Sequence, residues 1–146
     1  MFVKQISVFL ENTPGSLREL THLLGKNRID MMALSVADTQ SFGIARIIVV
    51  DDSIDPALAI LRTAGYTAKV NNVVCVKVAD EPLGLCHVLE DIEQIGASVE
   101  YMYSFMRATG DCALLILRLS DQDASMEKLT AKGVEMVSQE EINAMG

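Results

Sequence analysis

The chain opens with an apolar run followed by an amphipathic stretch. Residues Val3–Leu10 are apolar and rich in β-branched side chains, which predicts a strand. From Leu17 to Leu24, leucines recur at three- and four-residue spacing, which predicts a helix with one apolar stripe. We expect that helix to begin at Thr13-Pro14, with threonine as its N-cap and proline at its first position.

The pattern continues through the first half of the chain and then repeats. The remaining elements predicted for the first half are strands at 29–37, 44–50 and 66–70, a turn at 38–43, and a helix from Asp55-Pro56 to Gly65. An offset of 68 residues places Pro14 on Pro82 and Leu17 on Leu85 and keeps apolar positions in register. By this repeat, strands are expected at 73–79, 97–107, 111–119 and 134–138, with helices at 83–95 and 122–132.

The repeat predicts two modules, residues 1–71 and 72–146, each with the order β-α-β-β-α-β. That order predicts an α+β fold of two ferredoxin-like modules in tandem, each an antiparallel sheet with both helices on one face. Runs such as Val73–Val76, Ile47–Val50 and Leu114–Leu117 are apolar at consecutive positions, so both faces of the sheets require burial. We expect the face without helices to pack against a second sheet, from the other module or from another copy; the alternative is an exposed apolar sheet.

Composition excludes several classes of function. Twenty acidic residues against twelve basic ones give a net charge of −8, which argues against a nucleic-acid partner. Because no apolar run reaches the roughly 18 residues needed to cross a bilayer and no export signal is visible, we expect a cytoplasmic protein without a membrane partner. Cys75, Cys86 and Cys112 are odd in number and lie in apolar stretches, which predicts buried, reduced thiols and no metal site.

Residues that could carry out catalysis are scarce. His22 and His87 occupy unrelated places in the repeat and are expected to be partly exposed and unpaired. No glycine-rich phosphate loop is present, and acidic pairs such as Asp51-Asp52 suit helix starts. We therefore expect no enzymatic activity, no cofactor and no catalytic residue.

Several segments resemble the ACT domain, a small-molecule sensing module of amino-acid metabolism. The resemblance rests on the element order and on these segments: Glu11–Leu17, Asn27–Met31, Ala33–Thr39, Gly43–Arg46 and Val99–Phe105. It covers nearly the whole chain, once per half, and is greatest with stand-alone tandem-ACT proteins that carry no catalytic domain. It implies an allosteric amino-acid sensor that forms a homodimer, whose effect either passes to a separate metabolic enzyme or stops at ligand binding.

Ligand-binding members of the family hold a free amino acid between the loop after the first strand of one domain and the start of the second strand of its neighbour. The resemblance implies a site made of these residues: Glu11, Asn12, Thr13, Pro14, Gly15, Ser16, Leu17, Asp30 and Met31. Gly15 would let a ligand approach the free amides at the helix start, which favour a carboxylate. The same loop is also an ordinary helix start that needs no ligand, and Asp30 could equally be a solvent-facing strand residue.

The second loop is expected to form a weaker site or to serve as scaffold. Leu83 replaces the glycine after Pro82, and Gly84 could compensate by one position. The weaker site would consist of Asp80, Glu81, Gly84, Leu85 and Ser98. An alternative function is that of a regulatory subunit of an enzyme such as acetolactate synthase, which Leu34–Val36 and Gly43–Arg46 also resemble. A third is a purely structural dimerisation module.

Overall fold

The computed structural model describes residues 2–38, 42–106, 110 and 112–146. Its strands form one antiparallel six-stranded sheet in the order β2-β3-β1-β4-β6-β5. The strands are β1 (Val3–Glu11), β2 (Ala33–Asp38), β3 (Phe42–Ile48), β4 (Ala68–Ala79), β5 (Val99–Ser104) and β6 (Cys112–Leu119). The helices are α1 (Ser16–Lys26), the 3₁₀ turn η1 (Asp51–Ser53), α2 (Ile54–Thr63), α3 (Gly84–Gln94), α4 (Gln122–Ala131) and α5 (Gln139–Met145).

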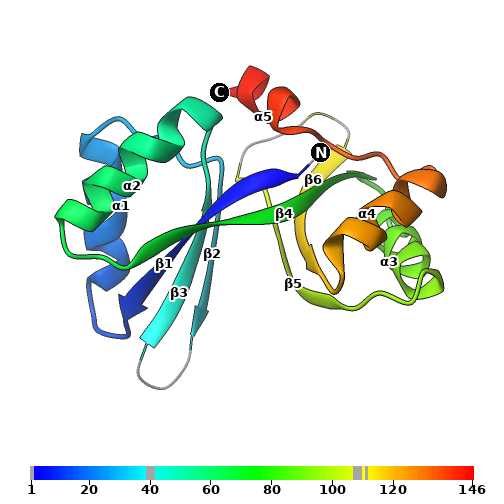
Figure 1. Cartoon of the computed structure of the whole chain (residues 1–146), viewed down its shortest axis with the longest axis horizontal. Helices are drawn as coiled ribbons and strands as arrows, with labels where there is room; N and C mark the ends of the chain where they lie inside the picture. Colours follow the sequence, from blue (N-terminus) through cyan, green and yellow to red (C-terminus); the bar gives the residue numbers. More distant parts are fainter. Residues whose placement is uncertain (1, 39–41, 107–109, 111) are drawn as a thin grey trace.

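Each half of the chain buries its helices on one face of its part of the sheet, as predicted. Helices α1 and α2 lie together at one end of the molecule, and α3 and α4 lie at the other, with β4 crossing between them (Figure 1). Alternate residues of β1, from Ile6 to Leu10, pack against α1 and α2, while Val74, Val76 and Val78 pack against α3 and α4. Two of the hydrophobic cores therefore belong to one module each.

Strand β4 joins the two modules without a loop. The strands predicted separately at 66–70 and 73–79 are one strand of 12 residues, because Asn71 and Asn72 remain paired with Gln5 and Lys4 of β1. The first half of β4 pairs with β1 and the second half with β6. The predicted module boundary, between residues 71 and 72, thus falls inside a continuous strand.

A third core fills the space between the modules and confirms that the apolar runs at 47–50, 73–76 and 114–117 are buried on both faces. Val3 and Ile48 of the first module meet Val73, Ile116 and Phe105 there. The edge strands β2 and β5 also meet, through a bridge between Ala33 and Phe105 and a 2.9 Å hydrogen bond from the backbone N–H of Met106 to the carbonyl of Met32. The sheet consequently folds back on itself around this third core.

The start of α1 differs from the prediction. The helix begins at Ser16, and Pro14 stands two residues before it rather than at its first position. The backbone N–H of Ser16 donates to the carbonyl of Thr13 at 3.2 Å, and Gly15 has φ +88° and ψ −9°. These are the features of a type II turn, in which proline suits the second position and glycine the third. Helix α2 likewise begins at Ile54, ahead of the predicted Asp55-Pro56 start.

The C-terminal part of the chain also departs from the prediction. The strand predicted at 134–138 is reduced to an isolated bridge between Val76 and Met136. Helix α5 follows it and was not predicted; the Ser138 hydroxyl caps this helix by accepting from the backbone N–H of Glu141 at 3.2 Å. The predicted turn at 38–43 includes residues 39–41, which lie outside the described residues.

The cysteines are not all buried, contrary to the prediction. Cys75 lies in the core between the modules, whereas Cys86 on α3 is exposed and Cys112 is half-buried. None of the three forms a disulfide with another described residue. Cys86 is exposed because it lies on the outer face of the amphipathic helix α3. The buried residues of that helix are Gly84, Val88 and Ile92.

We expect the buried thiol to make the protein less stable in alkaline solution. Burial, and then the nearby Glu141 carboxylate, raises the pKa of Cys75 from 9.0 to about 12. Above pH 9 the unfolded chain loses this proton and the folded chain keeps it until about pH 12. Folding stability should therefore fall as pH rises through this window, by up to about 1.4 kcal/mol per pH unit. Urea unfolding of the wild type and of Cys75→Ala between pH 8 and pH 10 measures the effect; equal slopes would contradict it.

Among the described residues, no helix is long and apolar enough to cross a membrane.

Candidate functional site

The loop between β1 and α1 borders a pocket of about 350 Å³. The pocket is lined by Leu10, Glu11, Asn12, Thr13, Ser16, Leu17, Val36 and Gly43. Five of these belong to the predicted site, Glu11–Leu17, and the others come from β1, β2 and β3. The loop that the sequence singled out therefore stands beside a cavity.

Two features fix the shape of the loop. The Thr13 and Ser16 hydroxyls are 2.6 Å apart and hydrogen-bonded, which closes the turn described above. A Cβ built at Gly15 would meet no heavy atom within 4 Å, so the space beside this glycine is open. Gly15 is required for its positive φ, and the open space follows from the turn it makes.

The first turn of α1 borders this pocket through Ser16 and Leu17. The N–H of Ser16 is used within the turn, but no hydrogen bond joins the N–H of Leu17 or Arg18 to another described residue. Such amides, together with the helix dipole, favour an anionic group. The Glu11 carboxylate lines the same pocket and supplies a negative charge for a cation. The loop can thus address both charges of a zwitterion.

A neighbouring pocket of about 270 Å³ lies on the other side of this loop. It shares Leu10, Glu11 and Ser16 with the first and reaches Glu19 and Tyr66. Burial, and then the Glu19 carboxylate, raises the pKa of Tyr66, so the phenol stays protonated and can donate a hydrogen bond at neutral pH.

The structure does not bring Asp30 and Met31 to this pocket. Ala33, at the start of β2, is opposite Ile48, whereas Glu11 is opposite Phe42. These positions are six residues apart along β3, which corresponds to roughly 20 Å of strand. Within one chain the loop and the start of β2 therefore lie at opposite ends of the sheet, and joining them requires a second copy.

The second loop is packed more tightly than the first. Leu83 has φ −108° and Gly84 is buried as the first residue of α3. A Cβ at Gly84 would lie 2.0 Å from the carbonyl oxygen of Ala79, so this glycine permits α3 to sit against β4. Ser98, on the far side of the module, pairs by its backbone with Ser120. This arrangement gives the second loop a structural role in packing.

Other groups on the described residues offer little chemistry. His22 and His87 are both exposed. No group of three or more His, Cys, Asp or Glu side chains in the described part of the chain could hold a metal ion.

Comparison with known proteins decides the family. The sequence matches the family described as "ACT domain pair" over residues 1–146. The chain belongs to this family. As an ACT domain pair it is also similar to protein BT0572 from Bacteroides thetaiotaomicron, with 34% identity, a TM-score of 0.87, and coverage of 98% of this chain and 96% of that one.

More distantly similar solved structures share the fold. The regulatory subunit of aspartate kinase from Thermus thermophilus, in its ligand-free form, has a TM-score of 0.62 at 17% identity and covers 88% of this chain and 91% of its own. The corresponding subunit from Thermus flavus has a TM-score of 0.58 at 16% identity and covers 88% and 90%. No curated protein matches the sequence.

Proposed function

We propose that this ACT domain pair is a regulatory module that binds a free amino acid at the Glu11–Leu17 loop. The observation that carries the proposal is the open pocket at the start of α1, because Glu11 and Leu17 both line it and the N–H of Leu17 has no hydrogen bond to another described residue. The amides of Leu17 and Arg18 would receive the ligand carboxylate, and Glu11 the ammonium. The family and its structural relatives among regulatory subunits support this role.

The proposed site uses two copies of the chain. Because Asp30 and Met31 lie roughly 20 Å along the sheet from the loop of their own chain, a homodimer would supply them from the neighbouring copy. The ligand would then change how the copies pack, and the effect would pass to a separate enzyme of amino-acid metabolism in the cytoplasm. The second loop, from Asp80 to Leu85, would act as scaffold.

A thermal-shift screen with the twenty amino acids tests the proposal. A ligand at about 100 times its dissociation constant should add about 2.7 kcal/mol of stability. In the variant Glu11→Gln, loss of the charge should weaken binding by about tenfold. Glu11 is a better position to change than Gly15, because any L side chain at φ +88° strains the turn.

Glu81→Gln in the second loop is the matched control and should leave binding unchanged. No stabilisation by any of the twenty amino acids would contradict the proposal and favour a structural dimerisation module. Co-purification with a thiamine-dependent catalytic subunit would instead favour a regulatory subunit of acetolactate synthase.

A further inference from the structure

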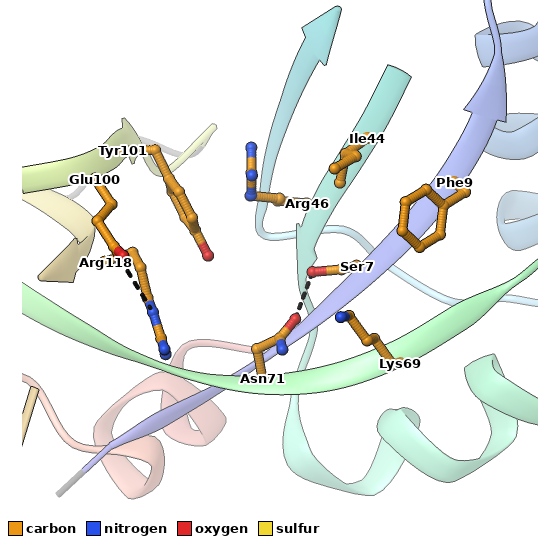
Figure 2. Close-up of a pocket in the computed structure, with 9 residues that line it drawn as sticks. All are labelled: Ser7, Phe9, Ile44, Arg46, Lys69, Asn71, Glu100, Tyr101 and Arg118. Carbon is orange, nitrogen blue, oxygen red and sulfur yellow. Dashed lines mark hydrogen bonds and ion pairs between the residues drawn. The ribbon is translucent and has the colours of Figure 1, made fainter. Parts of the chain in front are cut away.

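A third pocket, of about 320 Å³, lies between the two modules on the face of the sheet opposite the helices. Figure 2 shows that its side chains come from both modules: Ser7, Arg46 and Lys69 from the first, and Tyr101 and Arg118 from the second. None of them belongs to the amino-acid site proposed above. The pocket therefore needs its own explanation.

Strand register brings two cations into one row of this pocket. Arg46 of β3 is directly opposite Ser7 of β1, and Lys69 of β4 is directly opposite the same serine on the other side. Residues directly opposite each other point to the same face, and adjacent strands are about 4.8 Å apart. The two cationic side chains thus start roughly 10 Å apart, with a hydroxyl between them.

These two cations lack anionic partners. The Arg46 guanidinium lies 3.7 Å from the centre of the Tyr101 ring, and no hydrogen bond or ion pair joins Arg46 or Lys69 to another described residue. A third cation, Arg118, lies 3.8 Å from the Glu100 carboxylate, which balances its charge. The pocket consequently carries two excess positive charges in a protein whose net charge is −8.

The floor of the pocket is a fixed set of hydrogen-bonding groups. The Ser7 hydroxyl donates to Asn71 Oδ1 at 2.7 Å, which orients the Asn71 amide group so that its nitrogen remains a donor. Beneath them, Gln5 Nε2 donates to the Tyr101 hydroxyl at 2.8 Å and holds this ring in place under Arg46. Phe9 and Ile44 form an apolar wall at one side. The Ser7 and Asn71 groups and the Tyr101 ring beside Arg46 are therefore positioned before any ligand arrives.

We propose that this pocket binds a small organic dianion, a dicarboxylate or a phosphate monoester, between Arg46 and Lys69. Two cations about 10 Å apart at their α-carbons suit two anionic charges on a short carbon chain, which would lie against Phe9 and Ile44. Asn71 would donate to the same ligand. Because Tyr101 and Arg118 come from the second module, the ligand would connect the modules across the pocket and would be distinct from the amino acid at the Glu11–Leu17 loop.

Isothermal titration of the full chain with succinate and with glycerol 3-phosphate tests the proposal and distinguishes the two chemistries. At least one should bind, and Arg46→Gln and Lys69→Gln should each weaken its binding by about tenfold or more. Acetate, with one charge, should bind more weakly than the dianion. Lys77→Gln is the matched control, since Lys77 is an exposed lysine of the same strand whose contact is with Glu135 outside the pocket, and it should leave affinity unchanged.

Failure of both dianions to bind, or binding that persists in Arg46→Gln and Lys69→Gln, would overturn the proposal. Lys69 is exposed, so Lys69→Gln keeps the fold and remains informative even where Arg46→Gln loses its contact with Tyr101. The two proposed sites are separable, because Glu11→Gln should leave the dianion affinity unchanged and Lys69→Gln should leave stabilisation by amino acids unchanged. If the protein binds a dianion but is not stabilised by any amino acid, the proposed amino-acid site fails. If it is stabilised by an amino acid but binds neither dianion, the proposed dianion site fails.

Discussion

Gly84→Ala is expected to destabilise the protein by about 3 kcal/mol, although it adds a single methyl group. The new Cβ would lie 2.0 Å from the carbonyl oxygen of Ala79 and 3.1 Å from its carbonyl carbon. Both atoms are backbone of β4, which is paired and cannot turn aside as a side chain would. The clash can therefore be relieved only if α3 moves away from the sheet. That movement loosens the contacts of Val88 and Ile92 with the core.

Urea denaturation measures this loss, and Gly25→Ala provides a matched control. Gly25 is an exposed glycine of α1, where an added Cβ would meet nothing within 4 Å. Because alanine favours helix over glycine, this variant should gain about 0.5 to 1 kcal/mol. The same change from glycine to alanine should thus lower the urea midpoint at position 84 and raise it at position 25. A Gly84→Ala protein as stable as the wild type would show that α3 does not rest against β4 as described.

Gln5→Leu is expected to cost about 2 to 4 kcal/mol, because it removes the centre of a buried hydrogen-bond network. The Gln5 side chain has no exposed surface. Its nitrogen donates to the Tyr101 hydroxyl at 2.8 Å and its oxygen accepts from the Tyr103 hydroxyl at 2.5 Å. Leucine has a similar size but offers neither group, so both hydroxyls would lose this partner. Burial already raises the pKa of Tyr103 far above its usual value.

A double-mutant cycle with Tyr103→Phe separates this mechanism from a simple change of packing. Phenylalanine removes the hydroxyl that Gln5→Leu would leave unpaired, so the double variant should lose about 1 kcal/mol less than the sum of the two single variants. Gln94→Leu, on the exposed surface of α3, should change stability by less than about 0.5 kcal/mol. Strict additivity in the cycle would contradict the proposed network.

Periodicity was sufficient to predict the fold because the strands and helices of this chain carry their apolar residues at regular spacing. The runs Ile47–Val50 and Leu114–Leu117 also indicated burial on both faces, which the core between the modules confirms. Local sequence signals were less reliable where the same residues suit two different local structures. Pro14 before a leucine stripe suits both a first helical turn and a type II turn, and Gly15 at φ +88° selects the turn.

The remaining differences have identifiable causes. Asn71-Asn72 resembles a break between strands, but tertiary pairing with β1 keeps these residues extended. The sequence does contain a signal for the start of helix α5, since Ser138 and Glu141 stand three residues apart as in a capping box. The strand expected at 134–138 includes Ser138, so this signal was not interpreted as a helix start.

The two candidate sites differ in how far they can be predicted from the sequence. The residues of the Glu11–Leu17 loop are contiguous, so the sequence alone predicts them as one site. The pocket between the modules could not be predicted in this way, because Arg46, Ser7 and Lys69 become neighbours only through the register of three strands. The segments that contain Arg46 and Tyr101 resemble ACT proteins. The sequence, however, does not predict that these two side chains line one cavity.

The continuity of β4 restricts how the two modules can move relative to each other. A hinge needs backbone that is free to change its dihedral angles, and residues 68–79 are held by β1 over one half and by β6 over the other. The two halves are therefore expected to respond by torsion of a shared strand, with small rotations at one end carried to the other. Slow amide exchange at Asn71, whose N–H faces β1 in the middle of that strand, would show that the strand stays paired there, as torsional coupling requires.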